Sequence, residues 1–255
     1  MIILRFNYNG KNKTGILEEG IEGKVREVVE GCCYHEFVFT GNTYDINEVK
    51  LLPPCLPSKV AAVGLNYIDH VKEFGERDLP KEPTLFVKLP HTIIGPEDNI
   101  TIPAGAVRVD YEAELAIVIK KYCKNVNKED AISYILGATC LNDVTERDIQ
   151  ARDGQWTRSK NFETFCPIGP YIVDDIDYNN LDIMLLLNGD IKQHSNTSKM
   201  IWKAEELVSF ISKVIPLYPG DIVTTGTTSG VGPMKSGDVV EIKIEGVGTL
   251  KNYVK

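Results

Sequence analysis

Two glutamates in the segment 109–119 are two residues apart, which is the spacing that puts side chains on one face of a β-strand. The segment reads VDYEAELAIVI, so alternation places Glu112 and Glu114 together. Apolar residues continue both faces beyond Glu114, as in a strand that is covered on both sides. We therefore expect the two carboxylates to point into a cleft, although the same spacing also fits solvated carboxylates on an exposed strand edge.

Two carboxylates in a cleft repel each other, and this repulsion limits what the site can be. If their oxygens approach to about 5 Å, the repulsion is on the order of 3 kcal/mol at an effective dielectric constant of about 20. A proton on one carboxyl group, a nearby lysine or arginine, or a hard cation such as Mg²⁺ or Ca²⁺ would each offset it. The glutamate pair by itself leaves all three solutions open.

A third acid comes where another strand is expected to end. Asp143 follows the apolar run 135–141 and precedes a segment with helical character. Binding residues often lie just after a rigid element, which positions them. The same place also suits a residue that caps the next helix. Asp143 can therefore join the two glutamates or only begin a helix.

A histidine and a glutamate are expected to share one face of a helical turn. His70 and Glu73 are three residues apart within the segment 66–73, so their side chains can touch. A carboxylate that pairs with an imidazole fixes its tautomer and raises its basicity, as a general base requires. The alternative is an ordinary pair of surface residues.

Two other features could belong to a binding or catalytic site, but their sequence patterns are less specific. The segment 224–233 follows an expected strand and is rich in Thr and Gly, so it can present backbone N–H groups to an anion or only form a turn. It lacks the Gly-Lys-Ser/Thr of a P-loop. Lys160 is a single cation for which an exposed surface position is the simplest explanation.

The composition narrows the class of protein. A formal net charge of -8 argues against nonspecific nucleic-acid binding, which needs a basic surface. No apolar run approaches the roughly 18 residues that span a bilayer, so we expect no membrane partner and a cytoplasmic location. The six cysteines lack the C-x-x-C spacing of zinc or redox sites, and we expect free thiols.

The elements that must position these residues are mostly short strands. Residues 1–52 read as a small β-rich subdomain, and the Pro-rich stretch at 53–57 marks the boundary to a larger domain, 53–255. In that domain, apolar β-branched segments are expected at 59–64, 85–88, 100–102, 113–120, 135–142 and 171–173. Helices are fewer, one after Asp143 and one over 202–214. The pattern predicts an α+β fold dominated by a strongly bent sheet.

Six blocks of the sequence, in this order, resemble the fumarylacetoacetate hydrolase family. They are Gly64-Leu65-Asn66-Tyr67-Ile68-Asp69-His70-Val71-Lys72-Glu73, Phe86-Val87-Lys88-Leu89-Pro90, Asp110-Tyr111-Glu112-Ala113-Glu114-Leu115, Asn142-Asp143-Val144-Thr145-Glu146-Arg147-Asp148, Ser159-Lys160-Asn161-Phe162-Glu163-Thr164-Phe165 and Thr225-Gly226-Thr227. The resemblance runs from about Lys59 to Val254. It implies that family's fold, in which bent mixed sheets form a β-roll or sandwich with few helices.

The resemblance also assigns roles to residues. Glu112, Glu114 and Asp143 match the family's ligands for Mg²⁺ or Mn²⁺, with Ca²⁺ as a further candidate. His70 and Glu73 are similar to the dyad that activates water on a lid segment. Lys160 and Gln150 resemble groups that polarise the substrate. The positions that match substrate-binding residues are Arg147, Thr227, Gly226 and Tyr67. Relatives are commonly homodimers.

This sequence departs from the family pattern at two places. Leu89 replaces a proline that often follows Phe-x-Lys-Pro, and Leu65 stands where Arg or Lys is common. The second difference bears on the charge of the preferred substrate.

The resemblance implies an enzyme that acts on small 2-keto acids. Our first hypothesis is an acylpyruvate-type hydrolase, in which water activated by the His-Glu dyad cleaves a C–C bond and a metal stabilises the enolate. The second is a decarboxylase or keto–enol isomerase of substrates like oxaloacetate or 2-hydroxyhepta-2,4-diene-1,7-dioate. A hypothesis of another class is a non-catalytic binding protein that the metal braces.

Overall fold

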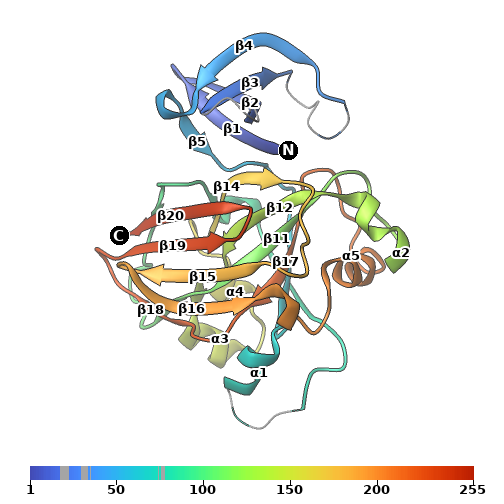
Figure 1. Cartoon of the computed structure of the whole chain (residues 1–255). Helices are drawn as coiled ribbons and strands as arrows, with labels where there is room; N and C mark the ends of the chain where they lie inside the picture. The colour runs from blue at the N-terminus through green and yellow to red at the C-terminus, as the bar shows by residue number, and fades with distance from the viewer. Residues whose placement is uncertain (18–22, 30–33, 35, 74, 76–77) are drawn as a thin grey trace.

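The computed structural model describes residues 1–17, 23–29, 34, 36–73, 75 and 78–255, and these residues build three β-sheets with few helices (Figure 1). The helices are short: α1 (Ile68–Glu73), α2 (Lys128–Ala131), α3 (Arg147–Asp153), α4 (Thr157–Lys160) and α5 (Ala204–Ser212). The predicted α+β class with a dominant sheet is confirmed. None of the described helices is long and apolar enough to cross a membrane.

The largest sheet has 12 strands and runs from the N-terminal segment into the body of the molecule. Its main path has the order β4-β3-β2-β1-β14-β12-β11-β17-β6-β7, while β5 pairs with β1 and β8 with β14. The strands are β1 (Ile2–Tyr8), β2 (Lys11–Leu17), β3 (Lys24–Val28), β4 (Phe39–Asp45), β5 (Lys50–Leu52), β6 (Val60–Gly64), β7 (Thr84–Lys88), β8 (Ile93–Ile94), β11 (Ala113–Ile119), β12 (Ile135–Asn142), β14 (Cys166–Val173) and β17 (Ile222–Thr227).

Two smaller sheets complete the fold. One has five strands in the order β16 (Asp190–Asn196), β15 (Asp182–Leu187), β19 (Val239–Ile244), β20 (Gly248–Val254) and β9 (Asn99–Ile100). The other has three, β13 (Thr145–Glu146), β10 (Val109–Tyr111) and β18 (Gly232–Met234). Strand β16 is polar in sequence, and its buried residues Gln193 and Ser195 are separated by the exposed His194.

The main hydrophobic core lies between the large sheet and the five-stranded sheet. Strands β11 and β12 contact β15, β19 and β20 across it. Leu115 and Ile117 from one side, and Leu185 and Ile242 from the other, are almost completely buried in one cluster. This packing buries both faces of β11, as the apolar run that follows Glu114 predicts. A buried, rigid strand is thus available to hold the two glutamates.

The N-terminal strands have a small core of their own and are also joined to the large sheet. Leu4, Phe6 and Val25 form a separate buried cluster. Strand β1 pairs antiparallel with β14, with Ile2 opposite Val173, so the large sheet continues across residue 52. The division into 1–52 and 53–255 stays a prediction. Cys123, Cys140 and Cys166 are buried free thiols, Cys55 is also buried, and Cys32 and Cys33 lie outside the described residues.

Glu27 on β3 is the centre of a hydrogen-bond cluster in this N-terminal segment. Its carboxylate accepts from Lys13 Nζ at 2.6 Å, and the other donors are Asn42, Tyr44 and Thr40. Burial raises the pKa of Glu27, but these donors outweigh it and hold the pKa at about 2, below the ordinary 4.5. The side chain is 12% exposed, so solvent screens these contacts only in part.

We expect Glu27 to stabilise the fold in a pH-dependent way. Because the folded pKa is the lower one, its contribution is complete above about pH 4.5 and is lost as the pH falls towards 2. Glu27→Gln should lower the free energy of unfolding by about 1–3 kcal/mol at neutral pH and by less than half of that near pH 3. Urea unfolding at several pH values measures this, with the exposed Glu48→Gln as control. An equal loss at both pH values would contradict it.

Candidate active site

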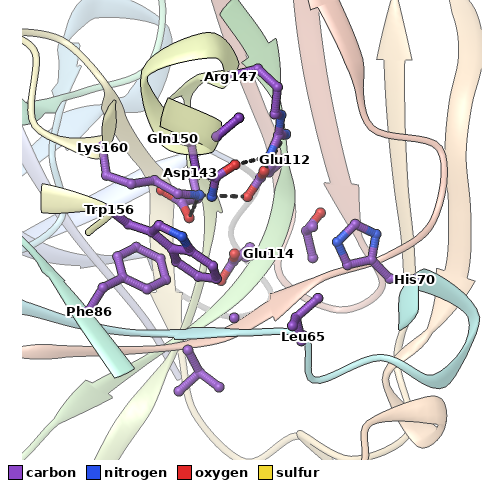
Figure 2. Close-up of a pocket in the computed structure, with 14 residues that line it drawn as sticks. Leu65, His70, Phe86, Glu112, Glu114, Asp143, Arg147, Gln150, Trp156 and Lys160 are labelled. Carbon is purple, nitrogen blue, oxygen red and sulfur yellow. Dashed lines mark hydrogen bonds and ion pairs between the residues drawn. The ribbon is translucent and has the colours of Figure 1, made fainter. Parts of the chain in front are cut away.

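A cavity of about 280 Å³ opens where several elements end on one side of the large sheet. The ends of β6 and β17, the junction of β10 and β11, the segment after β12, and helices α3 and α4 meet there. Figure 2 shows polar side chains on one part of its wall and the Phe86 and Trp156 rings on another. The lining residues are Val63, Gly64, Leu65, His70, Phe86, Glu112, Glu114, Asp143, Arg147, Gln150, Ala151, Trp156, Lys160 and Thr227.

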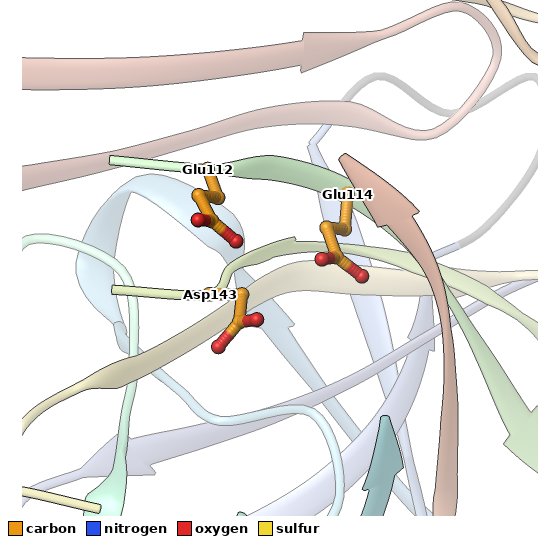
Figure 3. A group of neighbouring side chains, drawn as sticks. All are labelled: Glu112, Glu114 and Asp143. Atoms are coloured by element: carbon orange, nitrogen blue, oxygen red, sulfur yellow. The ribbon is translucent and has the colours of Figure 1, made fainter. Parts of the chain in front are cut away.

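Three of the lining residues form a compact acidic group. Glu112, Glu114 and Asp143 each offer a carboxylate oxygen within 4.8 Å of the others (Figure 3). Strands β11 and β12 are antiparallel with Ala113 opposite Asn142, so the residues just outside that pair, Glu112 and Asp143, come together. All three side chains are buried. The exposed strand edge that the spacing also allowed is therefore wrong.

Lysines neutralise two of these acids. Lys160 Nζ lies 2.9 Å from Glu112 Oε2 and 2.5 Å from Asp143 Oδ2, and Lys88 Nζ lies 2.7 Å from Asp143 Oδ1. Burial lowers the pKa of Lys160, but the charges of Asp143 and Glu112 outweigh it, so the pKa is raised and the ammonium form is favoured. Lys160 is 2% exposed, and the surface position that was simplest from sequence is wrong.

Glu114 is in a different electrostatic position from the other two acids. Its Oε2 accepts a hydrogen bond from the Gly226 N–H at 2.9 Å. Burial, and then the charge of Asp143, raise the pKa of Glu114 well above its usual range, which favours a proton on this carboxyl group. Basic neighbours therefore offset the repulsion at Glu112 and Asp143, and the raised pKa of Glu114 favours a second way, a proton on that carboxyl group.

The acidic group also fits a hard divalent cation. Three convergent carboxylates are the ligands that Mg²⁺, Mn²⁺ and Ca²⁺ prefer. The oxygens that would bind the cation are partly those that contact Lys160 Nζ. A cation would therefore replace the Glu114 proton and compete with the Lys160 ammonium for Glu112 and Asp143.

Arg147 connects Glu112 to a further buried carboxylate, that of Asp110. It donates from Nη2 to Glu112 Oε1 at 2.6 Å, from Nη1 to Gln150 Oε1 at 2.6 Å, and from Nε to Asp110 Oδ2 at 2.9 Å. Asp110 is fully buried and also accepts from Arg108. We had assigned no role to Asp110 or Lys88. The alternation that put Glu112 with Glu114 also places Asp110 on that face, and Lys88 is a charge within an apolar strand.

His70 and Glu73 form the expected pair, with His70 buried at the cavity and Glu73 exposed. His70 Nδ1 is 3.0 Å from Glu73 Oε2, and Glu73 Oε1 accepts from the Gly230 N–H at 3.0 Å. Because an ionised carboxylate only accepts, Nδ1 carries the hydrogen, and the lone pair of a neutral ring is on Nε2. His70 is 6% exposed and lines the cavity, while Glu73 does not.

The other sequence-predicted residues lie at different depths. Thr227 lines the cavity and is paired with Glu114 across β11 and β17. Gly226 acts through its backbone N–H, as described for Glu114. Tyr67 is fully buried and is not among the lining residues, and burial raises its pKa.

Two aromatic rings that we had not assigned to the site form its apolar wall. Phe86 and Trp156 meet edge to face with centroids 5.2 Å apart, and Lys160 Nζ lies 4.9 Å from the Phe86 centroid. A Cβ added at Gly64 would lie 2.4 Å from Cζ3 of Trp156. The glycine therefore lets the indole lie against strand β6.

We expect Gly64→Ala to displace the Trp156 ring. Overpacking of this kind should lower the free energy of unfolding by about 1–3 kcal/mol. It should also change the fluorescence of Trp156, which can be separated from that of Trp202 by comparison with Trp156→Phe. In the Trp156→Phe background, where the smaller ring leaves room, Gly64→Ala should cost less. Equal costs in the two backgrounds would show that the contact with Trp156 is not the cause.

Comparison with known proteins agrees with this geometry. Residues 59–255 match the family described as fumarylacetoacetate (FAA) hydrolase C-terminal, and residues 1–54 match Rv2993c-like, N-terminal. The chain is 55% identical to the uncharacterized protein MJ1656 of Methanocaldococcus jannaschii, with 84% of this chain and 88% of that protein covered. It is 44% identical to the mitochondrial oxaloacetate tautomerase Fahd2a of Rattus norvegicus, with 80% and 68% covered.

The solved structures show the same architecture. The 2-hydroxyhepta-2,4-diene-1,7-dioate isomerase of Mycobacterium marinum superposes with a TM-score of 0.92 at 42% identity, over 100% of this chain and 98% of that one. The expected bent-sheet fold is confirmed, and an enzyme is indicated in place of a non-catalytic binding protein. The chain belongs to the fumarylacetoacetate hydrolase family, and it is an enzyme related to the oxaloacetate tautomerase and the isomerases of that family.

Proposed function

We propose that this enzyme catalyses keto–enol tautomerisation of a small 2-oxo dicarboxylic acid of the oxaloacetate type, with a divalent cation held by Glu112, Glu114 and Asp143. One observation carries the proposal: His70 and Lys160 lie on opposite sides of the acidic group (Figure 2). Tautomerisation needs a group that takes a proton from carbon and another that stabilises charge on oxygen. The names of the tautomerase and isomerase relatives support the same chemistry.

The positions of His70 and Lys160 assign one proton transfer to each residue. Neutral His70, oriented by Glu73, removes a proton from C3 of the keto form through Nε2. The electron pair of that C–H bond becomes the C2=C3 double bond, and the carbonyl π pair moves onto the C2 oxygen. Lys160, with its raised pKa, donates a hydrogen bond to that oxygen and transfers a proton to it; proton exchange with solvent restores His70 and Lys160. When bound, the cation would lower the energy of negative charge on the oxygen.

Other lining residues orient the substrate and limit water. Arg147 has three of its five N–H groups engaged by Glu112, Gln150 and Asp110, so its position is fixed while two donors remain for a substrate carboxylate. The wall of Phe86 and Trp156 covers one side of Lys160. An enclosed site strengthens these interactions and protects an enol from side reactions.

Hydrolysis of an acylpyruvate, our first hypothesis from sequence, becomes the second candidate. The observation that favours it is the His70–Glu73 contact of 3.0 Å, which also suits activation of water for attack on a distal carbonyl. Hydrolysis needs a water molecule beside His70 in addition to the groups already named. The cytoplasmic location and the homodimer stay predictions.

The test compares both reactions in one protein preparation. Purified enzyme with Mn²⁺ or Mg²⁺ is mixed with enol-oxaloacetate, and loss of the enol absorbance is followed against the spontaneous rate; acetylpyruvate and fumarylpyruvate test C–C cleavage. We expect a metal-dependent acceleration with oxaloacetate, and a loss of about 10²–10⁴-fold in His70→Asn. If metal-bound protein leaves the enol to decay at its spontaneous rate, tautomerisation is ruled out, and cleavage of an acylpyruvate would establish the second candidate.

A further inference from the structure

A buried glutamine from the five-stranded sheet contacts the strand that carries the two glutamates. Gln193 lies on β16 and is 1% exposed. Its Oε1 accepts from the Ala113 N–H at 2.9 Å, and its Nε2 lies 2.9 Å from Thr227 Oγ1 and 2.9 Å from the Thr228 carbonyl oxygen. Ala113 is the residue between Glu112 and Glu114. One side chain therefore contacts both the backbone between the two glutamates and the cavity-lining Thr227.

The orientation of the Gln193 amide is determined by its backbone partners. The Ala113 N–H can only donate, so the atom facing it is the amide oxygen. The Thr228 carbonyl can only accept, so the atom facing it is the amide nitrogen. With both ends determined, the second hydrogen of Nε2 points to the hydroxyl oxygens of Thr227 and Thr228, which lie 2.9 and 3.2 Å away.

This orientation also determines the direction of the Thr227 hydroxyl. Thr227 Oγ1 accepts from Gln193 and donates its only hydrogen to the Ala113 carbonyl oxygen at 3.0 Å. Both the N–H and the C=O of Ala113 are thus held, the first by Gln193 and the second by Thr227. Thr227 lines the cavity, and its hydroxyl oxygen retains a lone pair that can accept a hydrogen bond.

We propose that Gln193 is a positioning residue for the cation and for the substrate. It holds the Ala113 peptide, and so sets the separation of the Glu112 and Glu114 side chains. It also holds Thr227 as a hydrogen-bond acceptor, which suits the hydroxyl of an enol. Partners behind the direct ligands of a metal typically change its affinity 10–100-fold when they are removed. The inference rests on the proposed metal site and on the proposed tautomerisation.

The test replaces Gln193 with methionine, which has a similar length and no amide. The control is Asn252→Leu, because Asn252 is a buried amide that donates to the carbonyl oxygens of Gly95 and Asp98 and does not line the cavity. Both variants remove buried hydrogen bonds and should lower Tm. The first readout is the Kd of Mn²⁺, measured from the electron paramagnetic resonance signal of free Mn²⁺ at a temperature where all proteins are folded.

We expect Gln193→Met to raise the Kd of Mn²⁺ by about 10-fold or more, while Asn252→Leu changes it less than about 2-fold. At saturating Mn²⁺, kcat of Gln193→Met should stay about 10-fold below the wild type, because Thr227 is no longer held. Wild-type Mn²⁺ affinity in Gln193→Met would overturn the inference, and full kcat at saturating Mn²⁺ would overturn the part that involves Thr227. Because Mn²⁺ binding needs no turnover, failure of the proposed reaction is distinguishable from failure of this inference.

Discussion

Lys160→Met is expected to lower the free energy of unfolding of the metal-free enzyme by about 3 kcal/mol. The substitution removes an ammonium group that contacts Glu112 and Asp143 in a buried site. Removal of one partner from a buried ion pair costs about 3–5 kcal/mol, because the remaining charge is left uncompensated. The lower end applies here, because Arg147 still contacts Glu112 and Lys88 still contacts Asp143.

The same variant should depend more on the cation than the wild type does. With the ammonium absent, a divalent cation has no competitor for Glu112 and Asp143, so Mn²⁺ should raise Tm by more than it does in the wild type. Turnover should nevertheless fall about 10²–10⁴-fold, because the group that donates to the substrate oxygen is lost.

Thermal unfolding with and without Mn²⁺, after purification in its presence, measures this effect. The control is Lys192→Met, which removes a surface ion pair with Asp190 at 3.4 Å and should change Tm little. If metal-free Lys160→Met unfolds at the wild-type temperature, the ammonium is not what balances the acids.

Glu114→Gln is expected to have the opposite effect on stability and a comparably large effect on turnover. Burial and Asp143 raise the pKa of Glu114, so the folded state binds this proton more tightly than the unfolded chain does. At a pH above 4.5 this difference lowers the stability of the folded state, and the loss grows with pH until the folded pKa is reached. A neutral glutamine avoids it. The metal-free variant should therefore be as stable as the wild type or more stable at neutral pH.

The Glu114→Gln protein, by contrast, should no longer bind the cation. A neutral amide oxygen is a poorer ligand than a carboxylate, so the increase of Tm with Mn²⁺ should disappear. Stabilisation of transition-state charge by a metal contributes several kcal/mol, which corresponds to a loss on the order of 10³-fold in kcat/KM. The exposed Glu163→Gln serves as control. A Glu114→Gln protein that binds Mn²⁺ with wild-type affinity would remove Glu114 from the set of ligands.

Much of the site could be predicted because it depends on short-range patterns. A period of two residues places Glu112 and Glu114 on one face, and a spacing of three brings His70 and Glu73 into contact. The expected strand 135–142 is β12, which ends next to Asp143. These relations need only the local backbone, so one segment of sequence contains them.

Other parts of the site depend on which segments pair. Nothing near Lys160 in the sequence indicates that its ammonium would contact two acids, because the contact crosses 48 residues to Glu112 and 17 to Asp143. Gln193 belongs to a polar stretch that resembles a loop, and its contact with Ala113 crosses 80 residues. Such contacts follow from sheet packing, which buries polar groups where they must find partners.

The sequence by itself therefore determined the family, the three acids and the histidine–glutamate pair. Only the tertiary structure decided how the charges of the acids are balanced, that Tyr67 does not line the cavity, and that Gln193 contacts Ala113 between Glu112 and Glu114. The physical reason is that strand periodicity fixes the direction of a side chain from its neighbours. Its charge environment, in contrast, depends on residues that strand pairing and core packing bring from distant parts of the chain.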